Sequence, residues 1–458
     1  HGVGADRVHR AGRIKSVSGP ALFRAVPEQA GRPDPRWVRS TSFVNGGTAL
    51  PGGAAIARCD CQVYELDPMK PLNPTFSSLG TTIFTTMSAL AAEHGAINLG
   101  QGFPDEDGPA DILEAAATAL RNGPNQYPPM AGLPALRQAV SSHDRRFYGL
   151  DYDWQSEVLV TSGATEALAA CLTALLAPGD EVVLFEPLYD SYLPVIRQCG
   201  ASARIVRLSP PDWRVPEADL AAAFSPATKL VLINSPMNPT GKLFGGGELE
   251  RIAALVNAHN AYVLCDEVYE HLVFDGARHE TIAALPGMRE RTLRIGSAGK
   301  SFSLTGWKVG YVSGPADLVS VVAKVHQFLT FTTPPNLQSA VAYALGRDDA
   351  YFNELAISLQ TKRDRLAAGL AHAGFGVLPA AGTYFLTATI EGAGRAFGTD
   401  VEYARWLTIE GGVATVPCSA FYAGPDPPQT MIRFCFCKKD EVLDAAIDRL
   451  CRVLARAG

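Results

Sequence analysis

Residues 261–269 read Ala-Tyr-Val-Leu-Cys-Asp-Glu-Val-Tyr, an apolar run that leads directly into two acidic residues. The run 261–264 has the length and composition of a buried strand. Asp266 lies just beyond it, where a carboxylate without a partner would be costly. We therefore expect a cationic partner for Asp266. A helix N-cap or an ordinary ion pair is the alternative that this stretch alone leaves open.

The same pattern recurs along most of the chain. Apolar runs suited to buried strands alternate with helical stretches such as 165–176 and 248–258. The runs cover residues 157–160, 181–185, 203–206, 229–233, 261–264, 292–295 and 309–312. This alternation predicts an α/β fold with a largely parallel sheet that is covered on both faces. Ligands bind beyond the carboxyl ends of strands in such sheets, so the residues after each run are the candidate site residues.

The two ends of the chain differ from this central part. A long charged helical stretch and shorter strand-like pieces after residue 345 predict a second, smaller α+β lobe. Residues 1–68 are rich in Gly, Pro and scattered Arg, so we expect an irregular leader or a spurious upstream extension, with a transit peptide as the alternative. The predicted parts are a leader at 1–68, an N-terminal arm of the small domain at 69–115, a large domain at 116–345 and a small domain at 346–458.

Composition excludes several classes of protein. Of the 458 residues, 47% are hydrophobic and 19% are charged, which is typical of a globular chain rather than a disordered one. The net charge of -6 provides no overall positive field for nucleic acid or an anionic membrane surface. The longest apolar stretch, 167–177, is too short to span a membrane. Nine cysteines without a CxxC pair indicate neither a disulfide framework nor a zinc ribbon, so we expect no metal and a reducing, cytoplasmic location.

Lys300 is the central candidate for chemistry. It lies in Ser297-Ala298-Gly299-Lys300-Ser301, directly after the run 292–295. A P-loop is excluded because position 294 is Arg where that motif needs Gly, and no GxGxxG sequence opens a helix after a strand. A lysine in a partly desolvated pocket has a lowered pKa, and its neutral amine can form a Schiff base with an aldehyde cofactor. An exposed loop lysine is the interpretation that the motif alone favours.

Other strand ends supply possible partners for such a cofactor. A pyridinium nitrogen would satisfy Asp266, and its protonation makes the pyridine ring an electron sink. Tyr269, three residues further on, could reach the same ring. Residues 162–165 follow a predicted strand and open a helix, so their free backbone N–H groups and a hydroxyl could bind a phosphate. Residues 234–242 form an irregular loop after another strand, although many turns look similar.

Taken together, these motifs resemble the class I and II aminotransferases of pyridoxal-phosphate fold type I. The likeness rests on seven motifs in order, at residues 163–165, 186–190, 234–242, 266–269, 297–300, 306–310 and 433. The kynurenine, glutamine and methionine aminotransferase branch is the most similar, and residues 98–109 resemble N-succinyldiaminopimelate aminotransferases. The resemblance implies a large domain with a mainly parallel seven-stranded sheet, together with a smaller α+β domain.

The resemblance also implies the cofactor pyridoxal 5'-phosphate and a role for each motif. Lys300 would be the Schiff-base anchor and then the general base, while Asp266 would pair with the pyridine nitrogen. Tyr189 would stack on the ring. The remaining implied contacts are Asn238 and Tyr269 to the phenolic oxygen, and Gly163, Ala164, Thr165, Ser297 and Lys308 to the phosphate.

Substrate and partner follow from the same resemblance. Arg433 would clamp the substrate α-carboxylate, helped by Asn238 and the backbone N–H of Gly102, although an isolated strand arginine exposed to solvent is the alternative. Tyr127 would reach across a two-fold interface to the neighbouring cofactor phosphate, which requires a homodimer. A core aromatic flanking a turn is the alternative for Tyr127.

The expected reaction is ping-pong transfer of an amino group from an amino acid donor to a 2-oxo acid acceptor. Residues 329–336 carry no charge, which disfavours a dicarboxylate such as aspartate and favours a neutral side chain. A C–S β-lyase on the same fold is the first alternative. A regulatory protein with this fold and a DNA-binding module is the second, but residues 1–68 lack the helices and basic face it needs. Trp307 and Tyr384 are expected to serve packing rather than chemistry.

Overall fold

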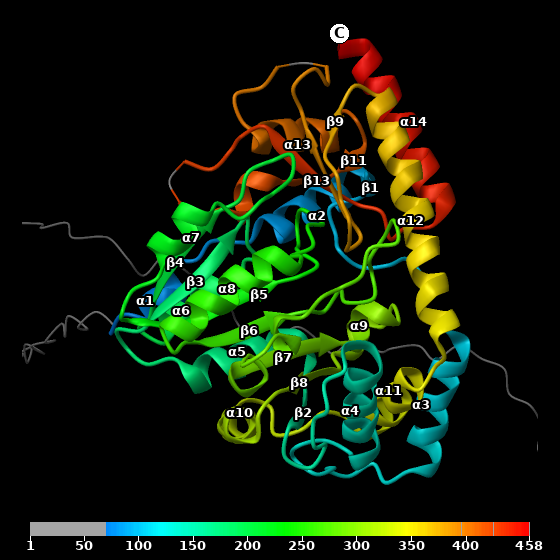
Figure 1. The fold of residues 1–458 in the computed structure, drawn as a ribbon. Helices are drawn as coiled ribbons and strands as arrows, with labels where there is room; N and C mark the ends of the chain where they lie inside the picture. The colour runs from blue at the N-terminus through cyan, green and yellow to red at the C-terminus, as the bar shows by residue number, and fades with distance from the viewer. Residues whose placement is uncertain (1–69, 395, 425, 458) are drawn as a thin grey trace, which may run out of the picture. The chain divides into compact units, whose positions relative to one another are not determined.

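The computed structural model describes residues 70–394, 396–424 and 426–457, so the predicted leader at 1–68 lies outside the described residues. A seven-stranded sheet forms the centre of the described chain, in the order β2-β8-β7-β6-β5-β3-β4 (Figure 1). Its strands are β2 (Val158–Thr161), β3 (Glu181–Glu186), β4 (Ser202–Arg207), β5 (Thr228–Asn234), β6 (Tyr262–Asp266), β7 (Thr292–Ser297) and β8 (Gly310–Ser313). Strand β8 pairs antiparallel with both β2 and β7, and the other four pairs of this sheet are parallel. The predicted α/β fold with a mainly parallel sheet is confirmed.

Both faces of this sheet are buried, as the continuous apolar runs predict. Successive side chains of a strand point to opposite faces. In β5, Leu230 and Leu232 therefore join one hydrophobic cluster, while Val231 and Ile233 join another. These four side chains are at most 2% exposed. Burial of this apolar surface is the main force that holds helices against both sides of the sheet.

Helices cover each face in turn. The first face is covered by α5 (Gly163–Leu175) and α10 (Ala316–Leu329). The second face is covered by α3 (Ala110–Asn122), α4 (Pro134–Tyr148), α7 (Glu217–Ala223), α8 (Gly246–Ala258) and α11 (Pro335–Leu345). The shorter helices are α1 (Pro74–Ser77), α6 (Tyr192–Gln198) and α9 (Ala298–Ser301). This layering leaves the carboxyl ends of β5, β6 and β7 at one edge of the sheet, where a ligand can approach.

A second, four-stranded antiparallel sheet lies in the C-terminal part, in the order β12-β13-β10-β9. Its strands are β9 (Gly376–Val377), β10 (Phe385–Thr389), β12 (Val416–Pro417) and β13 (Met431–Cys435). A short parallel pair, β1 (Ile97–Asn98) with β11 (Val413–Ala414), joins residues from opposite ends of the described chain. Arg433 lies on β13, between Thr387 of β10 and Val416 of β12.

Helices α2 (Ile83–His94), α12 (Asp349–His372), α13 (Asp400–Ile409) and α14 (Asp440–Ala457) complete the C-terminal part. The 24-residue α12 packs beside α14 (Figure 1). Its N-cap is Asp348, whose side chain accepts a hydrogen bond from the backbone N–H of Tyr351. In the described part of the chain, every helix is too short or too polar to cross a membrane.

Candidate active site

The ends of three neighbouring strands bring the predicted site residues together. Asn234 at the end of β5 pairs with Asp266 at the end of β6, and Asp266 pairs with Ile295 of β7. The strand β7 ends at Ser297, and Lys300 follows in α9. A cavity of about 730 Å³ opens at this edge. Its lining includes twelve of the predicted residues: Gly102, Gly163, Ala164, Thr165, Tyr189, Asn238, Asp266, Tyr269, Ser297, Lys300, Lys308 and Arg433.

Asp266 is the buried anion of this cavity. Only 5% of its surface is exposed, and its Oδ2 accepts a hydrogen bond of 2.6 Å from the hydroxyl of Tyr192. Its Oδ1 is buried without a hydrogen-bond partner. Burial raises the pKa of Asp266 to about 6, although the Tyr192 hydroxyl opposes the shift. An orphan carboxylate oxygen of this kind requires a charged donor from a ligand, and the protonated nitrogen of a pyridine ring is such a donor.

Tyr192 is a site residue that the sequence analysis missed. It is the first residue of α6, and its ring lies 5.7 Å from that of Tyr189, between ring centres. Its position three residues after Tyr189 was the only available signal. The hydrogen bond to Asp266 depends on how α6 lies against the end of β6, and local sequence does not reveal that contact.

Lys300 contributes a half-buried amine to the same cavity. Burial lowers the pKa of Lys300, although the nearby Cys437 and Cys435 thiols oppose the shift. Its Nζ donates a hydrogen bond of 2.8 Å to the hydroxyl of Tyr384. A lowered pKa increases the fraction of unprotonated amine, which is the form that attacks an aldehyde.

Tyr384 was expected to serve packing alone, and the structure corrects that expectation. Its ring is 1% exposed, as packing predicts. A buried tyrosine hydroxyl still needs polar partners, however. It accepts the hydrogen bond from Lys300 and donates one of 2.6 Å to the carbonyl oxygen of Gly102. Trp307 is partly buried against a hydrophobic cluster, as expected.

The turn after β2 offers an anion site. Gly163 opens α5 with φ +72°, in the left-handed region that favours glycine, and no side chain caps the helix. A Cβ at Gly163 would lie 3.2 Å from Cε of Lys308, so the close approach of this lysine also favours glycine. Lys308 Nζ lies 3.5 Å from the Thr165 hydroxyl and has no carboxylate partner among the described residues. Free N–H groups, a hydroxyl and an ammonium together suit a phosphate.

Arg433 is a buried cation without a counter-ion. It is 2% exposed, and it forms no ion pair within the part of the chain that the structure describes. Its two terminal nitrogens donate hydrogen bonds of 2.8 Å to Asn238 Oδ1 and to the Gly100 carbonyl, while Nε has no partner. Burial lowers the pKa of Arg433. The guanidinium stacks 3.9 Å from the Phe385 ring centre. Such a group is suited to bind a carboxylate that arrives with a ligand.

Tyr127 is the one predicted residue that does not line this cavity. Its side chain is 83% exposed and contacts Phe331 edge to face, with 5.3 Å between ring centres. The core position considered as an alternative is therefore wrong. Its assignment to a neighbouring subunit's site stays a prediction.

The remaining polar groups fit pyridoxal phosphate from end to end. Asp266 can hold the pyridine nitrogen, Lys300 can reach the aldehyde carbon, and the turn at 163–165 with Lys308 can hold the phosphate. The orphan Oδ1 of Asp266 lacks a partner that this cofactor would supply.

Comparisons with known proteins agree with this geometry. The family model for aminotransferase class I and II matches residues 94–450. The chain is 49% identical to the probable N-succinyldiaminopimelate aminotransferase DapC of Mycobacterium tuberculosis, over 81% of this chain and 95% of that protein. It is 43% identical to the methionine aminotransferase of Escherichia coli, over 81% and 96%.

A comparison with solved structures supports the same family. The N-succinyldiaminopimelate aminotransferase from Mycobacterium tuberculosis superposes with a TM-score of 0.81 at 47% identity, and the match covers 84% of this chain and 100% of that one. The chain therefore belongs to the class I and II aminotransferases, and it is a pyridoxal-phosphate-dependent transaminase of fold type I.

Proposed function

We propose that this transaminase moves the amino group of an amino acid to a 2-oxo acid at the cavity formed by Asp266, Lys300 and Arg433. The observation that carries this assignment is the orphan Oδ1 of Asp266, a buried acceptor that faces the cavity without a cation. The bound cofactor supplies an electron sink that makes the substrate α-carbon acidic. The side chains of this chain supply binding, orientation and proton transfer.

Lys300 is the proposed proton carrier. Its amine is partly shielded from solvent, and a lowered pKa favours the neutral form that can accept a proton from the substrate α-carbon. The protonated amine would then return the proton to the cofactor carbon on the other side of the transferred nitrogen. The hydrogen bond from Nζ to the Tyr384 hydroxyl restrains the amine while it is free.

Arg433 is the proposed carboxylate clamp. A planar guanidinium can bind a carboxylate through two parallel hydrogen bonds. Asn238 and the Gly100 carbonyl hold its two terminal nitrogens, and Phe385 supports its flat face. Gly102 lines the same region, where a Cβ would approach Phe385 to 2.7 Å. Glycine therefore leaves room for the substrate carboxylate beside the backbone N–H at this position.

The proposed amino donor carries an uncharged side chain. The cavity lining includes Phe84 and Phe385, which lie against Arg433, together with Phe103 and Gln101. These side chains favour apolar or neutral polar groups. The relative in Escherichia coli is named a methionine aminotransferase, which supports this choice. The relative in Mycobacterium tuberculosis is named for N-succinyldiaminopimelate, so that amino acid belongs in the same test.

We further propose a homodimer in which Tyr127 completes the neighbouring cavity. Tyr127 and Phe328 are 83% and 85% exposed, and Phe331 contacts Tyr127. Large apolar side chains gathered on a surface are typical of a subunit interface. The seven cysteines of the described residues are all free, which supports a reducing, cytoplasmic environment.

A half-reaction tests the assignment. The purified protein with bound cofactor is mixed with methionine, glutamine, kynurenine, N-succinyldiaminopimelate or aspartate, and the visible absorption of the cofactor is followed. We expect rapid loss of absorption with a neutral donor, slow loss with aspartate, and recovery on adding 2-oxoglutarate. Absorption that no amino acid changes would contradict the proposal. Pyruvate released from a cysteine conjugate without an acceptor would indicate a β-lyase instead.

A further inference from the structure

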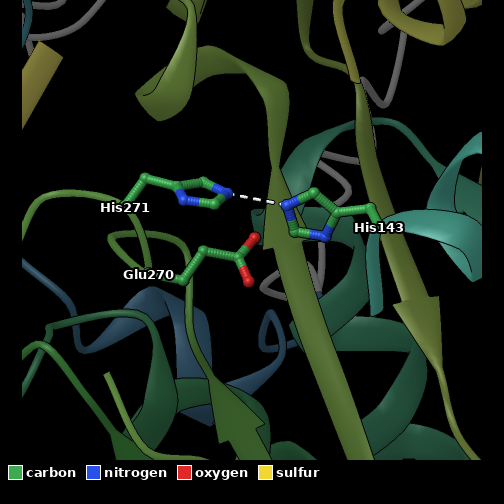
Figure 2. Close-up of side chains that lie close together, drawn as sticks. All are labelled: His143, Glu270 and His271. Atoms are coloured by element: carbon green, nitrogen blue, oxygen red, sulfur yellow. Dashed lines mark hydrogen bonds between the residues drawn. The ribbon is translucent and has the colours of Figure 1, made fainter. Parts of the chain in front are cut away.

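A second cluster of buried polar side chains lies outside the cavity. His143 on α4 faces His271 and Glu270, which follow Tyr269 in the segment after β6. Figure 2 shows the two imidazole rings pointing at each other, with the Glu270 carboxylate beside them. The two Nε2 atoms are 2.7 Å apart, the possible ligand atoms of all three residues lie within 4.8 Å of one another, and the side chains are buried.

This cluster lies in a region with too little positive charge. Arg294 contacts three buried carboxylates, Asp144, Glu267 and Glu270, and three negative charges against one positive leave a formal excess of two. Buried charges of one sign are costly without a counter-ion.

The neighbouring cations do not remove this excess. Arg146 pairs with the exposed carboxylate of Asp349, and Arg289 pairs with Glu157. His279 Nε2 lies 3.3 Å from Glu267, so an imidazolium there would offset one charge only. The Glu270 carboxylate accepts further hydrogen bonds from the hydroxyls of Tyr148 (2.6 Å) and Tyr311 (3.3 Å), which bring no charge.

The donor set has the chemistry of a zinc site. Two imidazoles and one glutamate are a recurrent zinc ligand set. Imidazole ligands commonly donate their second ring N–H to a carboxylate. His143 Nδ1 has no hydrogen-bond partner and lies 3.7 Å from Asp144 Oδ1, while Asp144 Oδ2 is also unpartnered. The side chains of His143 and Asp144 are 0% and 1% exposed, so these atoms are shielded from bulk solvent.

We propose that His143, His271 and Glu270 bind a divalent transition-metal ion of the zinc class. Two nitrogens at about 2.0–2.1 Å from a tetrahedral zinc ion are about 3.3 Å apart. The rings therefore separate by about 0.6 Å from their present 2.7 Å. The ring that carries its proton on Nε2 changes tautomer, so that this proton moves to Nδ1 of the same ring and both neutral imidazoles can bind the metal through Nε2.

Such an ion would be structural. It would join α4 to the segment at 266–271, which carries Asp266 and Tyr269 into the cavity. The three proposed ligands do not themselves line that cavity, so the ion would not touch the substrate. This inference adds a metal site to the transaminase and does not depend on the roles proposed for its catalytic residues.

The test is the metal content of the purified holoenzyme. The chain is produced in medium supplemented with zinc, so that the ion is present while the chain folds, and zinc per chain is measured after gel filtration. We expect close to one zinc ion per chain in the wild type and a loss of most of it in His143→Gln. The control is His259→Gln, whose imidazole hydrogen-bonds the Ser225 carbonyl and which should keep its zinc.

Two further measurements keep the test decisive if His143→Gln folds poorly. Wild-type protein produced with cobalt in place of zinc should show visible absorption bands of tetrahedral cobalt with nitrogen and oxygen ligands. The Lys300→Ala variant should retain as much zinc as the wild type while losing transamination, which separates this inference from the proposed function. Wild-type protein with no more zinc than His143→Gln, or with no cobalt bands, would show that the two histidines form only a hydrogen-bonded pair.

Discussion

Two buried regions of this chain use charge in opposite ways. Around Arg294, the guanidinium contacts Glu267 and two other carboxylates of the same chain. In the cavity, Asp266 has an orphan oxygen, and Lys300 hydrogen-bonds a hydroxyl. Neither Lys300 nor Arg433 forms an ion pair among the described residues. Pairing with Arg294 offsets part of the cost of burying those carboxylates. Charges left open toward a cavity indicate where a ligand completes the structure.

Replacing Lys300 should produce the largest effect on activity. Lys300→Met removes both the nucleophile and the proton carrier, so we expect turnover to fall by about 10⁴-fold or more. The control is Lys242→Met, because Lys242 is also shielded from solvent but does not line the cavity, and its Nζ pairs with Glu248 at 2.8 Å. That control should lose stability and keep its turnover. Steady-state kinetics distinguish the two, and a Lys300→Met enzyme with normal turnover would refute the assignment.

The two buried arginines should separate stability from activity. Arg294→Met leaves buried carboxylates unpaired, and we expect it to lower the free energy of unfolding by about 3–5 kcal/mol. Arg433→Met removes a desolvated charge and its hydrogen bonds together, so the change in stability should stay below about 1.5 kcal/mol. Its kcat/KM should fall by about 10²- to 10³-fold. Urea unfolding of the cofactor-free proteins measures stability. An equal decrease in the free energy of unfolding for both variants would contradict the difference proposed between the two arginines.

Asp266 should make the cofactor-free protein sensitive to pH. Its pKa is raised from 3.8 to about 6, so the folded state binds the proton more tightly than the unfolded state. The stabilisation from this proton is full below about pH 4 and is lost as the pH rises to about 6. The loss is about 3 kcal/mol. We expect urea unfolding to show this decline in the wild type, but not in Asp266→Asn. Bound cofactor should abolish the decline, because its ring nitrogen supplies the missing cation.

Removing the Tyr384 hydroxyl should have the smallest effect. Tyr384→Phe breaks one hydrogen bond to Lys300 and one to Gly102. We expect turnover to fall by about 3- to 10-fold, the range of one or two modest hydrogen bonds. Tyr403→Phe is the matched control, because its buried hydroxyl donates to the Ala393 carbonyl. Equal activity in both variants would restore the packing role that was first expected for Tyr384.

The sequence was informative where local pattern decides the structure. Apolar runs predicted the strands of the main sheet, and strand ends predicted the cavity lining, including Asp266 and Lys300. The family resemblance was needed to give those residues roles. Periodicity does not encode strand direction, so the antiparallel course of β8 could not be foreseen.

Contacts between distant segments were beyond local reasoning. Tyr192 meets Asp266 across 74 positions, and Tyr384 meets Lys300 across 84. The sequence showed only that Arg294 excludes a P-loop. Its ion pair with Asp144 could not be predicted, because Asp144 lies 150 positions away on α4. Tyr127 depends on a second subunit, so its role in the neighbouring site remains a prediction.

The hydroxyl of Tyr384 connects three distant stretches of the chain, since it bridges the Gly102 carbonyl and the Lys300 amine. The position of the Lys300 amine therefore depends on three stretches of the described chain, around Gly102, Lys300 and Tyr384. A proteolytic fragment that kept the whole central sheet but lost either flank would still contain Lys300. It would not hold that amine in the same orientation, so intact flanks are a condition for chemistry as well as for stability.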